Sequence, residues 1–122
     1  MSKTLKIVCI SDTHAQTYAE GFPEIPNGDI LLHAGDFTYK GQKEHVFKFN
    51  EWLGTLSHRH KIVIAGNHEK IFDSKLETNP EVIEDMRKLL TNCVYLEESE
   101  VTVFENCWKR SYMGKLNIEF SR

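Results

Sequence analysis

The chain has 122 residues and a formal net charge of −3, with 15 basic and 18 acidic residues spread along it. This length fits one domain, and the mixed charges argue against a nucleic acid polymer or a membrane surface as partner. The three cysteines form no CxxC pair, which argues against a disulfide framework and a thiolate zinc site. No apolar run approaches the ~18 residues of a membrane span, and the N-terminal apolar stretch is too short for a signal peptide. We therefore expect an intracellular, cytoplasmic protein.

Three short apolar segments predict strands of one sheet. They are Lys6–Ile10, Asp29–Leu32 and Lys61–Ala65, and none shows a regular alternation of apolar and polar residues. Continuous apolar runs are typical of strands that are covered on both faces, as in parallel sheets. The segments therefore predict an α/β fold with a largely parallel sheet.

The rest of the chain predicts helices that cross over between strands, and two further strands. Apolar residues at helical spacing across Gln42–Leu56 indicate a right-handed crossover helix between the second and third strands. The capping signal Thr78–Glu81, with proline in the first turn, predicts a second helix that stops near Asn92. Val94–Leu96 and Val101–Phe104 then predict two strands on either side of a polar turn.

Each of the first three predicted strands is followed by a short polar cluster. The clusters are Ser11–His14, Ala34–Asp36 and Gly66–Glu69. Because the carboxyl ends of parallel strands lie at one edge of a sheet, we expect these clusters to converge there. Mixed carboxylate, imidazole and amide ligands suit manganese, iron or zinc better than calcium. The candidate metal ligands are Asp12, His14, Asp36 and Asn67.

Each cluster by itself also has an ordinary explanation. Asp12 could cap a helix or turn the chain, and Gly-Asp and Gly-Asn steps are common in turns. His33, at a strand end, has the character of a buried and satisfied histidine or of a partner to a ligand. His45, His58 and His60 are expected on the surface. It is the occurrence of three clusters in order, each at a strand end, that favours a metal site.

The sequence resembles the calcineurin-like metallophosphoesterases. The likeness rests on Asp-x-His at Asp12 and His14, on Gly-Asp at 35–36 and on Gly-Asn-His-Glu at 66–69. The segments "VCISDTH", "GDILLHAGDFT" and "KIVIAGNHE" are more narrowly similar to the animal metallophosphoesterase-domain-containing branch of this family. The likeness runs from about Leu5 to Val103. It implies the N-terminal half of a four-layer α/β/β/α sandwich and the hydrolysis of phosphate mono- or diesters.

The resemblance also implies roles for individual residues. Asp12 and His14 would hold a first divalent ion, Asp36 would bridge two ions, and Asn67 would hold the second. His68 would face the substrate, where it stabilises phosphoryl oxygens or protonates the leaving group. Asp36 and His68 are thus the residues closest to the chemistry. The implied cofactors are two divalent metal ions, and the implied partner is a small phosphate ester, with cyclic nucleotides among the candidates.

The sequence departs from the family pattern downstream of His68. Complete members supply further metal-binding histidines there, but no histidine follows His68 in these 122 residues. Residues 104–122 show neither a helical nor a strand period, so we expect a partial phosphoesterase domain over residues 1–103 and a divergent tail. The second metal site is then incomplete. Two hypotheses remain: a metal-dependent phosphoesterase, or a catalytically silent, truncated chain that acts through binding.

Overall fold

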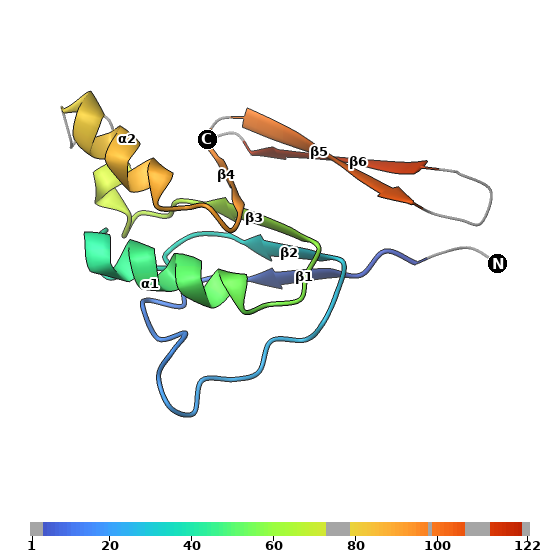
Figure 1. Ribbon diagram of the computed structural model, residues 1–122, viewed down its shortest axis with the longest axis horizontal. Helices are drawn as coiled ribbons and strands as arrows, with labels where there is room; N and C mark the ends of the chain where they lie inside the picture. Colours follow the sequence, from blue (N-terminus) through green and yellow to red (C-terminus); the bar gives the residue numbers. More distant parts are fainter. Residues whose placement is uncertain (1–3, 73–78, 98, 107–112, 121–122) are drawn as a thin grey trace.

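The computed structural model describes residues 4–72, 79–97, 99–106 and 113–120. It has a parallel sheet of four strands in the order β1-β2-β3-β4, two α-helices, and a separate antiparallel hairpin (Figure 1). The elements in chain order are β1 Ile7–Ile10, β2 Ile30–His33, α1 Lys43–Gly54, β3 His60–Ile64, the short 3-10 helix η1 Lys70–Phe72, α2 Pro80–Lys88, β4 Val94–Leu96, β5 Ser99–Asn106 and β6 Met113–Phe120.

The three expected strands are β1, β2 and β3, and they pair in parallel. Ile7 lies opposite Ile30, and Ile30 lies opposite His60. Helix α1 connects the neighbouring strands β2 and β3, as a crossover connection does. The predicted α/β class with a parallel sheet is therefore confirmed, and it has the form of the N-terminal half of the sandwich that the resemblance implies.

Both helices contribute to one hydrophobic core on the same face of the sheet. Leu31 and Val63 project from the strands into this core, where Phe49 of α1 and Met86 of α2 pack with them. Burying such side chains contributes roughly 1.5–3 kcal/mol each to folding. None of the helices in the described ranges has the length and apolar character that a membrane-spanning helix needs. This core fixes the strand ends from which the polar clusters extend.

The other face of the sheet packs against the hairpin β5-β6. Ile30 and Ile62 of the sheet form a second core with Val103 of β5. Strands β5 and β6 are antiparallel, and Val101 lies opposite Ile118. Although residues 104–122 show no clear period in sequence, Met113–Phe120 forms a strand that pairs with β5. Residues 107–112 and 121–122 of the expected tail lie outside the described residues.

The start of α2 agrees with the sequence-based prediction, but its C-terminal end does not. Asn79 caps the helix, and its side chain accepts a 3.0 Å hydrogen bond from the backbone N–H of Glu81. Thr78, the other part of the expected signal, lies outside the described residues. The helix ends at Lys88, before the expected stop at Asn92. Asn92 instead docks on α1, since its backbone N–H donates to Oδ1 of Asn50 at 2.8 Å.

Candidate metal centre

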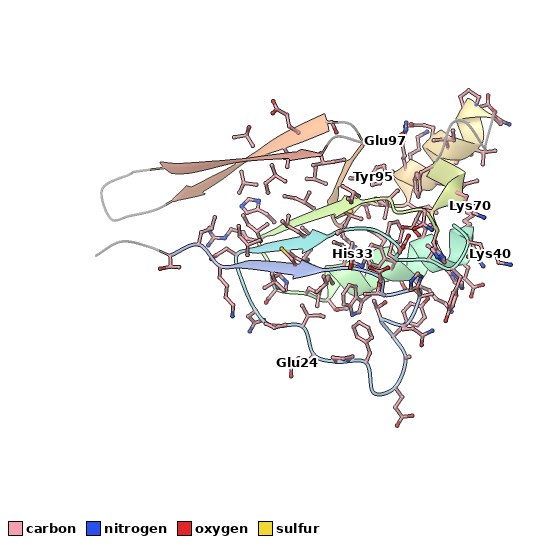
Figure 2. All side chains as sticks on the ribbon, turned by 180° about the vertical axis from the view of Figure 1, so that it is seen from behind. Glu24, His33, Lys40, Lys70, Tyr95 and Glu97 are labelled. Carbon is pink, nitrogen blue, oxygen red and sulfur yellow. The ribbon has the colours of Figure 1, made fainter. Side chains whose placement is uncertain are left out.

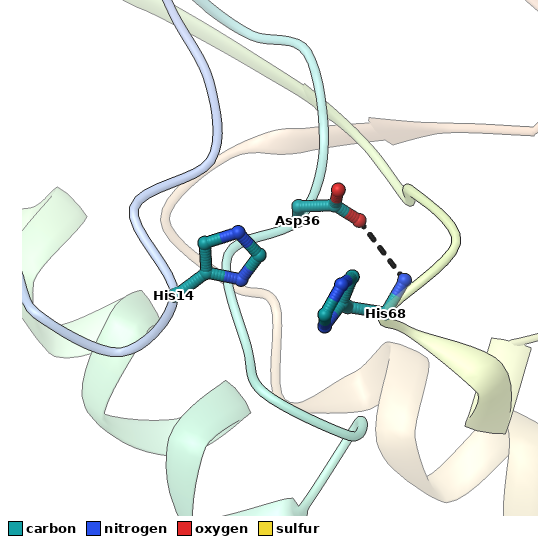
Figure 3. A group of neighbouring side chains, drawn as sticks. All are labelled: His14, Asp36 and His68. Atoms are coloured by element: carbon teal, nitrogen blue, oxygen red, sulfur yellow. Dashed lines mark hydrogen bonds between the residues drawn. The ribbon is translucent and has the colours of Figure 1, made fainter.

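The side chains of His14, Asp36 and His68 meet at the carboxyl edge of the sheet. They come from three loops that follow β1, β2 and β3: the first loop (11–15), the second loop (34–39) and the third loop (65–69). One ligand atom from each of the three residues lies within 4.8 Å of the other two. Figure 3 shows the three side chains reaching from separate segments toward one point. The predicted convergence of the loops is present in the structure.

Two backbone carbonyls orient the imidazole rings. Nδ1 of His14 lies 3.1 Å from the carbonyl oxygen of Thr38, and Nδ1 of His68 lies 2.7 Å from that of Tyr39. Because a carbonyl oxygen only accepts hydrogen bonds, Nδ1 must carry the hydrogen in both rings. Nε2 of each neutral ring then keeps its lone pair. Metal-ligating histidines are held in this way, with the far ring nitrogen donating to a carbonyl or carboxylate.

Asp36 provides the carboxylate of the group. Its Oδ1 accepts a 2.9 Å hydrogen bond from the backbone N–H of His68, which joins the second and third loops (Figure 3). This bond fixes Oδ1 of the carboxylate in position. The group therefore combines one anchored carboxylate with two oriented imidazoles.

Asp12 lies beside this group rather than within it. One of its carboxylate oxygens is 3.7 Å from Nε2 of His14, and the side chain is largely exposed. A hydrogen bond from the side chain of Ser11 lowers the pKa of Asp12 below its ordinary value, and Asp36 and His14 add to this effect. Asp12 therefore remains an anion next to His14. Asn67, the other predicted ligand, is exposed in the third loop.

Four non-glycine residues at this edge have left-handed backbone conformations. The φ angles are 56° at Asp12, 39° at His14, 59° at Ala15 and 57° at Asp36. Such angles are uncommon for residues with a Cβ, and strained backbone of this kind concentrates at functional sites. Three of the four are predicted metal ligands. The strained backbone therefore coincides with the residues whose side chains point toward the candidate metal site.

Backbone hydrogen bonds hold the first loop against the second. They continue the pairing of β1 and β2 beyond the ends of the strands, and each is 2.9–3.0 Å long. The donors are all in the first loop and the acceptors all in the second. The pairs are Asp12 N–H to Gly35 O, His14 N–H to Asp36 O and Ala15 N–H to Phe37 O.

Gly35 and Gly66 bring the second and third loops into backbone contact. A Cβ on Gly35, whose φ is +101°, would lie 2.6 Å from the backbone nitrogen of Gly66. A Cβ on Gly66 would overlap Oδ1 of Asp36. These glycines let two loops approach each other, so that the carboxylate of Asp36 has room.

Glu69 is a further residue of the site, and the sequence alone indicated no role for it. Its carboxylate is buried and accepts backbone N–H bonds from Phe37, Thr38 and Gly66 at 3.0–3.2 Å, together with the hydroxyl of Thr38 at 2.8 Å. Glu69 thereby ties the third loop to the second, whose Thr38 carbonyl orients His14. In the sequence, the one indication of this role is that Glu69 directly follows Gly-Asn-His. An acidic residue without such a role would be expected in solvent.

His33 lies at the carboxyl end of β2 (Figure 2) and links the first and second loops. Its Nδ1 accepts the backbone N–H of Gly35 at 3.1 Å, so Nε2 carries the hydrogen and donates to Oγ1 of Thr13 at 3.0 Å. Burial lowers the pKa of His33 from 6.5 to about 4, although Asp12 and Asp36 act in the opposite direction. His33 is therefore a buried, neutral histidine with both ring nitrogens hydrogen-bonded. This agrees with the first of the two roles expected for it.

The donor set fits a transition-metal cation. Two imidazole nitrogens with free lone pairs and one carboxylate oxygen lie within 4.8 Å of one another. Asp12 adds a second carboxylate near Nε2 of His14. Mixed nitrogen and oxygen donors are typical of sites for manganese, iron and zinc. Of the four predicted ligands, the structure places His14 and Asp36 in the group, Asp12 beside it and Asn67 in the adjoining loop.

Comparison with known proteins identifies this arrangement. Residues 5–113 match the family model described as calcineurin-like phosphoesterase. The chain is 46% identical over 114 residues to "Metallophosphoesterase domain-containing protein 1" of Homo sapiens and of Mus musculus, which covers 80% of this chain and 34% of each relative. It is 42% identical over 106 residues to a UPF0046 protein of Caenorhabditis elegans, covering 81% of this chain and 36% of that protein.

The matched region is short relative to those proteins. The chain spans about a third of the length of the metallophosphoesterase-domain relatives. The family match also extends to residue 113, beyond the likeness that the sequence motifs indicated up to Val103. It includes all three loops that carry His14, Asp36 and His68. The chain therefore belongs to the calcineurin-like phosphoesterase family.

Proposed function

We propose that the site hydrolyses phosphate esters with the help of divalent metal ions. The observation that carries the proposal is the convergence of His14, Asp36 and His68 from three separate loops, with both imidazoles oriented by backbone carbonyls. The members of this group are only half-buried, so they do not belong to the hydrophobic core. Family membership supports a phosphoester as the substrate.

The chain's own residues supply the ligands. Asp12 and His14 would hold a first ion, Asp36 would be shared by two ions, and Asn67 would add a neutral oxygen to the second. A pair of manganese, iron or zinc ions would supply Lewis acidity toward phosphoryl oxygens and make water a stronger acid. Asp36 would suit a position shared by two ions, because a carboxylate that accepts the His68 N–H at Oδ1 still has other lone pairs.

Although Nε2 of His68 also belongs to the group of possible metal ligands, we assign His68 to the substrate, as the family resemblance implies. Its Nδ1–H is committed to the Tyr39 carbonyl, so Nε2 is the atom that faces the reaction. In the protonated ring, Nε2–H donates to a phosphoryl oxygen, where it stabilises developing charge, or transfers a proton to the leaving oxygen. The substrate is a small phosphate mono- or diester, and cyclic nucleotides are candidates.

Hydrolysis of p-nitrophenyl phosphate esters by the full chain tests this proposal. We expect manganese-dependent release of nitrophenolate that is abolished by EDTA and by Asp36→Asn. Asp85→Asn, on the exposed side of α2, is the matched control and is expected to retain the rate. Absence of any manganese-dependent rate in the wild-type chain would overturn the assignment of catalytic activity to this chain.

A second candidate is a catalytically silent chain that binds a metal ion and acts through interaction. It is favoured by one observation: within the described residues, His14, Asp36 and His68 form a single compact group of the size that one ion needs, while Asn67 is exposed in the third loop. This alternative predicts binding of a single manganese ion without hydrolysis. The same assay, run alongside a metal titration, separates the two candidates.

A further inference from the structure

Tyr39 presents an exposed aromatic ring at the rim of the metal centre. Its backbone carbonyl accepts the Nδ1–H of His68 at 2.7 Å, which places the residue directly beside the group. Its ring lies nearly parallel to the imidazole of His14, at an interplanar angle of 18° and a centroid distance of 6.1 Å. Even so, 46% of the residue is exposed to solvent. An apolar ring therefore borders a charged site without being part of a core.

The ring is held in place by polar contacts. The amide nitrogen of Gln16 donates a 2.6 Å hydrogen bond to the Tyr39 hydroxyl and reaches the backbone carbonyl of His14 at 3.5 Å. His45 contacts the ring edge-on at a centroid distance of 5.7 Å. A side chain fixed in this way loses little conformational entropy when a ligand packs against it. The hydroxyl oxygen accepts from Gln16, so its own hydrogen remains available for a ligand.

Position distinguishes Tyr39 from the other exposed large apolar side chains of the described residues. Tyr18 is equally exposed, at 45%, but its ring contacts the ammonium group of Lys48 on α1. Phe47 also lies on α1, and Ile7 and Val94 lie on strands. Within this set Tyr39 is the residue whose ring contacts a member of the metal group.

We propose that Tyr39 is a specificity-determining residue whose ring stacks on a flat aromatic group of the phosphate ester. This inference rests on the proposed function, because it assumes that the phosphoryl group binds at His14, Asp36 and His68. Rings that pack offset or edge-on gain affinity beyond the area that they bury. The site then prefers esters that carry an aromatic ring over alkyl phosphates of the same charge.

Binding of two non-hydrolysable phosphonates tests this preference directly. Phenylphosphonate and methylphosphonate present similar anionic groups and differ in the ring. Each is titrated into the full chain in the presence of Mn²⁺, by calorimetry, for the wild type and for Tyr39→Leu, Tyr39→Phe and the matched control Tyr18→Leu. We expect phenylphosphonate to bind about 5- to 10-fold more tightly than methylphosphonate to the wild type. Tyr39→Phe and Tyr18→Leu keep this ratio.

Tyr39→Leu is expected to bring the ratio of the two affinities close to one. An unchanged ratio in Tyr39→Leu, or a wild-type ratio near one, overturns the inference and leaves the proposed function standing. If neither phosphonate binds the metal-loaded wild type, the proposed function fails and this inference fails with it. If Tyr39→Leu does not fold, an NMR measurement on the wild type alone still tests the inference. With diamagnetic Zn²⁺ in place of Mn²⁺, bound phenylphosphonate must show nuclear Overhauser contacts to the Tyr39 ring, and their absence overturns the inference.

Discussion

The backbone N–H of His68 donates a 2.9 Å hydrogen bond to Oδ1 of Asp36. The third loop thus holds the carboxylate that the second loop presents, and it does so through its main chain. The imidazole of His68 is free to serve the reaction because the backbone of the same residue supplies the support. The position of His68 therefore determines both the orientation of the Asp36 carboxylate and the placement of the His68 imidazole.

Gly66→Ala is expected to disrupt this relationship. The new Cβ would overlap Oδ1 of Asp36 and lie 2.6 Å from its backbone nitrogen, so the carboxylate must move. Displacing a ligand in this way is expected to weaken Mn²⁺ binding by about 10-fold or more. Isothermal titration with Mn²⁺ measures the effect.

Gly21→Ala provides the control for that experiment. Gly21 has a φ of +83° and open space around its Cα, so alanine there costs about 1 kcal/mol of stability through backbone strain alone. Its Mn²⁺ affinity is expected to equal that of the wild type. Equal affinities for Gly66→Ala and Gly21→Ala would show that the packing of Gly66 on Asp36 is irrelevant to the site.

Glu69→Gln is expected to destabilise the protein by about 2–3 kcal/mol. Glutamine keeps one acceptor oxygen, but its NH₂ group would face backbone N–H groups that now donate to the carboxylate. Urea denaturation monitored by tryptophan fluorescence measures the loss. Glu44→Gln on the exposed side of α1 removes a surface ion pair with Lys48 and is expected to cost no more than about 0.5 kcal/mol. A Glu69→Gln loss as small as that of the control would contradict the anchoring role.

Acid is expected to destabilise the fold through His33. The pKa of this residue is lowered to about 4 in the folded chain and returns to 6.5 on unfolding. Between these values the unfolded chain binds more protons, so the free energy of unfolding falls as the pH falls from 6.5 to 4. The loss at pH 4 is about 3 kcal/mol.

The comparison that isolates this effect is with His33→Asn. The variant is less stable at neutral pH, since it cannot reproduce both hydrogen bonds of the ring, but it lacks the titrating group. Urea midpoints of the two proteins at pH 7 and pH 4.5 are expected to converge on acidification. Parallel pH dependence of the two proteins would rule out His33 as the source.

Much of the fold followed from the sequence because its signals are local. Unbroken apolar runs predicted β1, β2 and β3, and the capping residue Asn79 predicted the start of α2. The same parallel arrangement predicted that the loops after the strands converge, as His14, Asp36 and His68 do. Periodicity and strand direction are enough for these features.

The features that the sequence did not indicate depend on contacts between distant segments. Glu69 is buried because backbone N–H groups more than 30 residues earlier converge on it. The left-handed conformations of Asp12 and Asp36 depend on hydrogen bonds between two loops. The strand Met113–Phe120 pairs with β5, although its own residues show no clear period. Tertiary pairing overrode the weak local signal in that segment.

Binding of Mn²⁺ to the full chain is the most direct test of the metal centre. Electron paramagnetic resonance of free Mn²⁺, titrated with wild-type protein, is expected to show saturable binding. The affinity is expected to fall at least about 10-fold in Asp36→Asn and to stay unchanged in Asp85→Asn. An absence of saturable binding, or equal affinity in the wild type and Asp36→Asn, would contradict the metal centre on which the account rests.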